Sequence, residues 1–265
     1  MDGSHATSTD RAAAWVGAAD RIAVLTGAGI STESGIPDFR GPNGLWTTRP
    51  ESMRLMNIED YLRDPSVRAD AWKERMRHPA WEARPNDGHR ALVSLERRGA
   101  LLALMTQNVD GLHQAAGSSH VLELHGTMHR AKCLSCDRRT PMREQLDRVR
   151  AGDPDPACTA CGGIQKSATV AFGEQLDPDV LEAAFAASRT SDLFLAIGTS
   201  LVVQPAALLA LEAHRHGARL VIVNQGETPF DQVADAMIRE PIGEVLPLIV
   251  GDGEPGQAVV SSSSP

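Results

Sequence analysis

The sequence predicts an α/β fold, in which a mostly parallel sheet is covered by helices on both faces and a smaller lobe lies beside it. Short apolar runs alternate with helical patterns along most of the chain, as expected for parallel strands joined by covering helices. Two stretches, 43–87 and 129–168, interrupt this alternation, and the second contains all four cysteines. A chain of 265 residues can bury a substantial core, so one large and one small domain are expected.

Five apolar runs are the expected strands of the sheet. The first, 21–27, follows an amphipathic segment at 12–19 and ends in glycines. The other runs lie at 101–109, 120–124, 192–197 and 218–223, with helical patterns that include 89–98 and 206–216 between them. Asp177 and Pro178 mark the start of another helix, which extends to residue 188. Pro247 should shorten or kink the last helix, which begins at Pro241.

The expected domains follow from this alternation. The large domain comprises residues 1–42, 88–128 and 169–250. The small domain comprises a helical insert, 43–87, and a cysteine-containing module, 129–168, that is rich in Gly and Pro. Residues 251–265 are mostly Gly, Ser and Pro with almost nothing to bury, so a disordered tail is expected there.

Composition limits the possible partners. Lys and Arg total 26 against 34 Asp and Glu, a formal charge of -8, so no global basic field attracts nucleic acid. The apolar runs are far shorter than the ~18 residues that a membrane span needs, and Asp2 and Asp10 argue against a signal peptide. We therefore expect a soluble, cytoplasmic monomer that binds neither membranes nor nucleic acid directly.

The four cysteines form two Cys-x-x-Cys pairs, Cys133 with Cys136 and Cys158 with Cys161, separated by 21 residues. This spacing is typical of a zinc ribbon in which four thiolates surround one ion. Two disulfides or a redox pair are the alternatives, but the chain has no secretory signal and a redox motif needs only one pair. Four thiolates close the coordination sphere, so one structural Zn²⁺ is predicted.

A glycine-rich turn follows the first strand. The small residues of 26–31 (TGAGIS) allow a backbone to approach a pyrophosphate, while the helix that follows presents free N–H groups. A tight turn that needs glycine is an equally good interpretation of the turn alone. The continuation to residue 41 is charged and aromatic, which favours a ligand-facing role for Asp38, Phe39 and Arg40.

Polar residues also follow other expected strands. Asn108 and Asp110 come after the second strand and His125 after the third, at the edge where open parallel sheets bind ligands. Capping of a helix near Gly111 and ordinary hydrogen bonding of the histidine are the simpler alternatives. The segment 198–200 and Asn224 follow the last two strands, where they suit either ribose and adenosine contacts or turns.

Taken together, these motifs resemble those of the sirtuin family, over residues from about 12 to 250. The motifs that carry the resemblance are 27–31 (GAGIS), 35–41 (GIPDFRG), 106–110 (TQNVD), His125–Gly126, the two cysteine pairs, 172–174 (FGE), 198–200 (GTS) and Asn224. The resemblance implies a Rossmann-like domain that binds NAD, a zinc-ribbon lobe, and an acyl-lysine peptide between them. It implies an enzyme, an NAD-dependent protein deacylase of the acyl-transferring class.

The resemblance also assigns roles to residues. Its NAD-binding residues are Gly27, Ala28, Gly29, Ser31, Asp38, Phe39, Arg40, Gln107, Asn108, Asp110, Gly198, Thr199, Ser200, Asn224 and Ile242. Asn108, Asp110 and His125 are its catalytic residues, with the histidine as general base. In the implied reaction the acyl oxygen attacks the ribose as nicotinamide leaves, and the histidine then deprotonates a ribose hydroxyl. The products are deacylated lysine, nicotinamide and O-acyl-ADP-ribose.

The same resemblance assigns peptide contacts to Val170, Phe172, Gly173 and Glu174, which pair with the substrate backbone as an added strand. Trp72 and Arg75 stand where acidic-acyl members of the family carry a Tyr-x-x-Arg pair, but the tyrosine is missing. We therefore predict a deacetylase and no succinyl or malonyl preference. A longer-chain or acidic-acyl deacylase and a protein ADP-ribosyltransferase remain alternatives.

Two other classes of protein are disfavoured by the residues themselves. An NAD oxidoreductase of this fold uses an acidic residue ~20 positions beyond the glycine turn, which is absent at a strand end here. A nucleic-acid-binding zinc module needs a basic, aromatic face, whereas this one offers only Lys132, Arg138 and Arg139.

Overall fold

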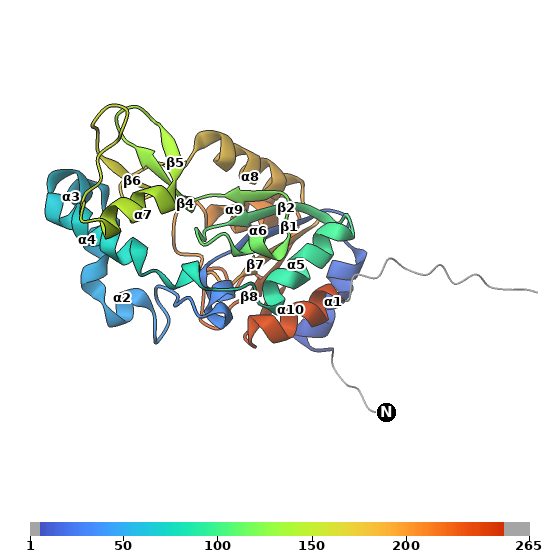
Figure 1. Ribbon diagram of the computed structural model, residues 1–265. Coiled ribbons are helices and arrows are strands. Elements are labelled where there is room, and N and C mark those ends of the chain that lie inside the picture. The colour runs from blue at the N-terminus through green and yellow to red at the C-terminus, as the bar shows by residue number, and fades with distance from the viewer. Residues whose placement is uncertain (1–5, 252–265) are drawn as a thin grey trace, which may run out of the picture.

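The computed structural model describes residues 6–251 and contains two sheets. The larger sheet has six parallel strands in the order β3-β2-β1-β7-β8-β9 (Figure 1). Its strands are β1 (Ile22–Thr26), β2 (Leu101–Thr106), β3 (Val121–Glu123), β7 (Leu193–Ile197), β8 (Arg219–Val223) and β9 (Ala236–Ile238). β1 and β7 are buried along their whole length because helices cover both faces of the sheet.

Two groups of helices cover this sheet, as Figure 1 shows. One face packs against α1 (Ser8–Ala18), α5 (Asp87–Arg97) and α10 (Ile242–Val250), and the other against α8 (Pro178–Thr190) and α9 (Leu208–Arg215). The alternating strand residues divide accordingly, with Val24 in the first core and Ala23 in the second. The predicted α/β class with a mainly parallel sheet is therefore confirmed.

Three details of the large sheet and its covering helices differ from the prediction. β9 was not predicted, because its residues 236–238 stand between Asp235 and Arg239 and form no longer apolar run. β2 ends at Thr106 rather than at residue 109, since the chain then turns to place Asn108 and Asp110. α10 continues through Pro247 to Val250, because Leu246 and its neighbours are buried against α1 and α5, which offsets the cost of a proline in a helix.

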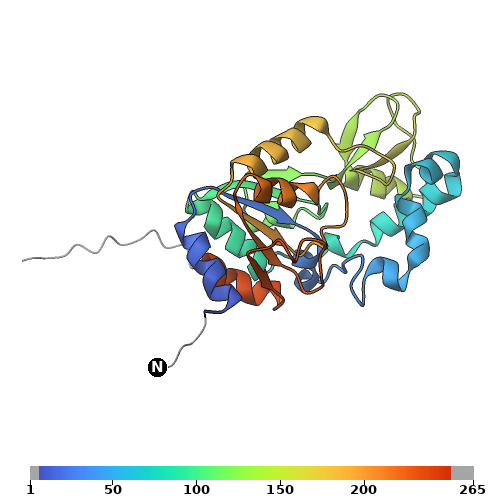
Figure 2. The same ribbon diagram turned by 180° about the vertical axis from the view of Figure 1, so that it is seen from behind.

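The second sheet has three antiparallel strands in the order β5-β4-β6: β4 (Gly126–Cys133), β5 (Arg139–Pro141) and β6 (Gln165–Thr169). It packs with α7 (Met142–Arg150) and with the helical insert, which lies at the same end of the molecule in Figures 1 and 2. The insert contains α2 (Leu45–Thr48), η2 (Pro50–Met56), α3 (Ile58–Arg63), α4 (Pro65–Met76) and η3 (Pro79–Trp81).

A small core joins the insert to the cysteine module. Trp72 of α4 is buried among Ala131 of β4 and Met142 and Leu146 of α7. Tyr61 of α3 adds a hydrogen bond from its hydroxyl to the Gln165 carbonyl at 2.7 Å. Two segments far apart in sequence therefore share one core.

The expected tail lies almost wholly in residues 252–265, outside the described part of the chain. Within residues 6–251, no helix combines the length and the hydropathy that crossing a membrane requires.

Backbone crosses backbone closely where the turns after β1 and β7 meet. A Cβ on Gly198, whose φ is +61°, would lie 2.4 Å from the Ile30 nitrogen, and one on Gly29 would lie 2.7 Å from the Gly198 Cα. The Gly29 N–H donates to the Gly198 carbonyl at 2.8 Å. Only glycine permits this approach, so the two glycines fix the distance between the turns.

The substitution Gly198→Ala should lower the free energy of unfolding by about 3 kcal/mol, because a positive φ and a backbone clash are both penalised. Gly217→Ala is the matched control, since Gly217 has a φ of +91° but open space around it, and a loss of about 1 kcal/mol is expected. Urea unfolding of the two variants measures the difference. Equal losses of unfolding free energy in the two variants would show that the close backbone approach at Gly198 does not restrict this position.

Candidate active site

The carboxyl ends of four parallel strands converge at one edge of the large sheet. The Gly27 N–H donates to the Ile197 carbonyl at 3.0 Å, and the Gly198 N–H donates to the Val223 carbonyl at 2.8 Å. The Gln107 N–H donates to the Thr26 carbonyl at 2.9 Å. These contacts bring the expected polar residues of separate motifs to one edge, which is where open α/β sheets bind ligands.

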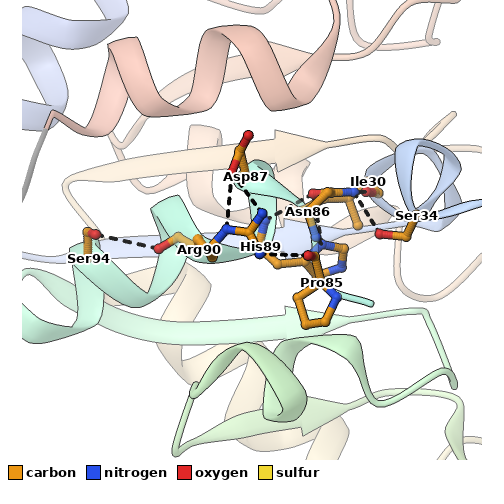
Figure 3. Close-up of polar contacts among 8 residues, drawn as sticks. All are labelled: Ile30, Ser34, Pro85, Asn86, Asp87, His89, Arg90 and Ser94. Atoms are coloured by element: carbon orange, nitrogen blue, oxygen red, sulfur yellow. Dashed lines mark hydrogen bonds and ion pairs between the residues drawn. The ribbon is translucent and has the colours of Figure 1, made fainter. Parts of the chain in front are cut away.

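The helix that follows the glycine-rich turn is a short 3₁₀ helix, η1 (Ala28–Ser34). Gly35, with a φ of +85°, ends it. Figure 3 shows how Asn86, which caps α5, holds this segment. The Asn86 amide donates to the Ile30 carbonyl at 2.8 Å and to the Ser34 hydroxyl at 3.0 Å. The turn is thus fastened to a helix of the core.

Ser31, Asn108 and Asp110 form one polar cluster. The buried Ser31 hydroxyl donates to the Asp110 carboxylate at 2.8 Å, and the Asn108 amide donates to the Gly27 carbonyl at 3.0 Å and to Ser31 at 3.2 Å. Asp110 also accepts the Leu112 N–H at 2.9 Å, at the start of α6 (Leu112–Ala116). Gly111 is the N-cap of α6, so Asp110 adds a bond to the first N–H of this helix and also holds the glycine-rich turn.

His125 lies directly before β4, and its Nδ1 is 3.0 Å from the Gln107 carbonyl. A carbonyl can only accept, so Nδ1 carries the proton and Nε2 is left as an unprotonated base. Burial lowers the pKa of His125 from its ordinary value, although the bond to Gln107 opposes that effect. The Gln107 amide also donates to the Thr199 hydroxyl at 2.9 Å, which ties this base to the turn after β7.

Two further histidines, which the sequence analysis did not single out, lie buried behind this cluster. His113 is 2.8 Å from the Thr26 hydroxyl, which donates to the Thr106 hydroxyl at 2.8 Å. The His89 ring lies 4.9 Å from that of His113. Burial lowers the pKa of His89 to about 4 and that of His113 to about 3, so both stay neutral at pH 7.

The loop that contains Asp38, Phe39 and Arg40 is closed on itself. The Asp38 carboxylate accepts the Gly41 N–H at 2.8 Å, while Phe39 lies 4.8 Å from the Trp46 ring and Arg40 lies over that ring at 4.5 Å. Trp46 is a member of this site that no motif in the sequence indicates. The loop sequence around it, with Gly44 and Leu45, gave no periodic signal that could have identified it.

The segment 170–174 begins beside the histidine. The Val170 N–H donates to the His125 carbonyl at 2.8 Å, and Glu174 accepts the Ala171 N–H at 2.8 Å. Lys166 of β6 forms an ion pair with Glu174 at 2.9 Å, although burial lowers the pKa of this lysine. Phe172 is left 40 % exposed and Gly173 has a φ of +92°.

The remaining expected residues are more dispersed. Trp72 is only 2 % exposed and lies in the core of the small domain. Burial lowers the pKa of Arg75 to about 10, and no carboxylate within residues 6–251 forms an ion pair with it. Asn224 donates to the Gly226 carbonyl at 2.9 Å, as a turn residue does. Ile242 begins α10, next to Gly243, whose N–H donates to Glu33 of η1 at 2.9 Å.

The four cysteine sulfurs lie within 4.8 Å of one another, at the end of β4, in the turn between β4 and β5, and in the loop before β6. The Sγ atoms of Cys133 and Cys161 are 3.5 Å apart, and those of Cys136 and Cys158 are 3.8 Å apart. A tetrahedral zinc with bonds of about 2.3 Å requires sulfurs about 3.8 Å apart, so the residues fit this ion. All four positions are protein ligands, so the ion has a structural role.

Fold and site together define a class: an α/β protein with a nucleotide-type ligand site at the carboxyl edge of its sheet and a structural zinc module beside it. The model of the Sir2 family matches residues 27–205. The chain belongs to the Sir2 family, and the resemblance drawn from its motifs is confirmed.

Relatives and solved structures agree with this assignment. "NAD-dependent protein deacetylase 2" of Streptomyces coelicolor is 54% identical over 231 residues, 86% of this chain and 96% of that protein. "NAD-dependent protein deacetylase 1" of Bradyrhizobium diazoefficiens is 44% identical over 253 residues, 93% and 96% of the two chains. A Sir2 variant with a deacetylated p53 peptide and 3′-O-acetyl ADP ribose superposes with a TM-score of 0.84 at 37% identity, covering 91% and 96%. A complex of Sir2, p53 peptide and NAD⁺ gives 0.80 at 37%, covering 88% and 93%.

The substitution Cys158→Ala should remove the bound zinc and lower Tm by more than about 5 °C, because the metal stabilises a module with a small core. Ser135→Ala is the control, since Ser135 lies between two ligands and its backbone N–H would still donate to Cys133. Zinc per chain, measured by atomic absorption, and a thermal melt test both effects. Full zinc content in Cys158→Ala would contradict the four-thiolate site.

Proposed function

We propose that the chain is an NAD-dependent protein-lysine deacetylase that releases nicotinamide, deacetylated lysine and O-acetyl-ADP-ribose. The single observation that carries the proposal is the histidine with a free Nε2 at the same sheet edge as the Ser31, Asn108 and Asp110 cluster. The names of the relatives and of the peptide complexes support the same activity. The small residues of the glycine-rich turn, which follow β1 at the carboxyl edge of the sheet, also support NAD as the co-substrate.

The dinucleotide would be held by the sheet edge. Gly27 and Gly29 let the turn after β1 pack directly against the segment 198–200, so both turns would border the dinucleotide. Asn108 and Asp110 would orient the nicotinamide half through hydrogen-bonding capacity that is not used within their own cluster. Asn224 and Ile242 would border the adenosine half. NAD supplies a ribose carbon that nicotinamide can leave, and ribose hydroxyls that can accept the acyl group.

His125 would act as the general base at Nε2. The Gln107 carbonyl fixes its tautomer, and burial keeps the ring neutral at pH 7, so it can take a proton from a hydroxyl held nearby. The peptide would pair with the segment 170–174, which begins at the carbonyl of the same histidine. In this arrangement the acyl-lysine would lie next to His125.

Arg75 supports one alternative acyl chain. Its guanidinium has no carboxylate partner within the described residues, and burial lowers its pKa, so an acidic acyl group would supply the missing charge. Acetyl-lysine remains the proposed substrate, because Trp72 stands in place of the tyrosine and is buried in a core. That the chain acts as a cytoplasmic monomer without nucleic acid stays a prediction.

The test is a direct assay of the full chain with NAD and acetyl-lysine or succinyl-lysine peptides. Nicotinamide and deacetylated peptide should form in equal amounts, and His125→Ala should lower kcat at least about 100-fold, as expected for loss of a general base. His120→Ala is the control, because His120 is exposed before β3. A faster reaction with succinyl-lysine favours the acidic-acyl alternative, and label from radioactive NAD on protein favours ADP-ribosyl transfer. No nicotinamide release with any acyl chain refutes the proposal.

The pH dependence of kcat/KM tests the state of the base. Because burial lowers the pKa of His125, the fall of activity at low pH should be centred below the ordinary histidine pKa of about 6.5. An acid limb centred above pH 6.5 would contradict the proposed environment of this ring.

The fold must be monitored in the same experiment. The pKa values of His89 and His113 are lowered in the folded protein, so the unfolded state binds protons first and stability decreases as the pH falls from about 6.5 towards 4. Circular dichroism at each pH separates this loss from the titration of His125.

A further inference from the structure

Three aromatic rings form a continuous contact that the proposed mechanism does not use. The Trp46 ring lies 4.8 Å from that of Phe39 and 5.6 Å from that of Phe172, measured between ring centroids. We call Phe39, Trp46 and Phe172 the aromatic link. Phe39 belongs to the loop assigned to NAD, and Phe172 belongs to the segment assigned to the peptide. The link therefore joins two segments with different proposed ligands.

Backbone contacts hold Trp46 firmly against the NAD loop. The Trp46 N–H donates to the Phe39 carbonyl at 3.0 Å, and the preceding Leu45 N–H donates to the Asp38 carbonyl at 2.7 Å. A Cβ on Gly44 would lie 2.6 Å from the Phe39 carbonyl carbon, so the loop is tightly closed. Any movement of Phe39 therefore carries Trp46 with it.

A second set of contacts joins Phe172, the other end of the aromatic link, to the helical insert. The Phe172 N–H donates to the Met56 carbonyl at 2.8 Å, and the Ile58 N–H donates to the Phe172 carbonyl at 3.0 Å. Asn57 and Phe172 thus form an isolated parallel bridge between the helical insert and the peptide segment. The Trp46 ring meets Phe172 beside this bridge, where 40 % of the Phe172 surface is exposed.

We propose that Trp46 is a positioning residue that couples the binding of NAD to the binding of the acyl-lysine peptide. The proposal rests on the proposed function, which assigns the two ligands to the two ends of the aromatic link. A peptide paired with 170–174 would fix Phe172, and through Trp46 it would favour the position of Phe39 and Arg40 that holds the dinucleotide. By linkage the dinucleotide must strengthen peptide binding by the same factor.

The nature of the contact decides which substitutions should preserve the coupling. The Trp46 Nε1 is buried and makes no hydrogen bond within the described residues, so the residue acts through the faces of its ring. An aromatic replacement should therefore keep the coupling, whereas an aliphatic one should lose the ring contacts.

The experiment measures the dissociation constant of ADP-ribose by calorimetry, with and without saturating acetyl-lysine peptide. The ratio of the two constants is the coupling factor. Wild type should show a factor above one, Trp46→Leu should lower it about fivefold, which corresponds to about 1 kcal/mol, and Trp46→Phe should restore it to within about twofold. Phe172→Leu, at the other end of the link, should lower it as well, and the double variant should lose no more than either single one.

Trp15→Leu is the matched control, because Trp15 also contacts an arginine, Arg219, but lies on α1 away from the link. It should leave the coupling factor unchanged. A wild-type coupling factor in both Trp46→Leu and Phe172→Leu overturns the inference, and so does independent binding of ADP-ribose and peptide in wild type. If Trp46→Leu cannot bind ADP-ribose, the coupling factors of Phe172→Leu and Trp46→Phe decide whether the inference holds. Nicotinamide release by wild type is measured separately, so failure of the proposed function is distinguished from failure of the coupling.

Discussion

The contact of backbone with backbone between the turns after β1 and β7 is the constraint on which the rest of the site depends. Gly29 and Gly198 touch without side chains, so the two turns lie closer than any other pair of residues would allow. Ser31 reaches Asp110 only because η1 is held in this position, and Asn86 fixes the same segment from the side of α5. The geometry of the polar cluster thus depends on the close contact between Gly29 and Gly198.

Much of this arrangement could be predicted because its signals are local. Apolar runs marked five of the six large-sheet strands, and parallel strands necessarily bring their carboxyl ends to one edge. The spacing of Cys133, Cys136, Cys158 and Cys161 specified a closed metal site without knowledge of the fold. His125 could be placed at that edge, although its tautomer required the position of the Gln107 carbonyl.

The parts that escaped prediction depend on contacts between distant segments. Nothing in the sequence separates the buried, neutral His89 and His113 from exposed histidines, because only their surroundings lower their pKa. Trp72 has the spacing of a pocket residue, yet the cysteine module covers it. Trp46 gained its significance only when Phe172, more than a hundred residues away, proved to be its neighbour.

The zinc module leaves and rejoins the large domain at adjacent points. Gly126 pairs with Thr169 across β4 and β6, and directly beyond that pair the Val170 N–H meets the His125 carbonyl. The zinc module, between these residues, therefore begins and ends at one pair of hydrogen-bonded strands. Such a module can lengthen, shorten or acquire new surfaces while His125 and the segment 170–174 keep their mutual register, because the bond that joins them lies outside it.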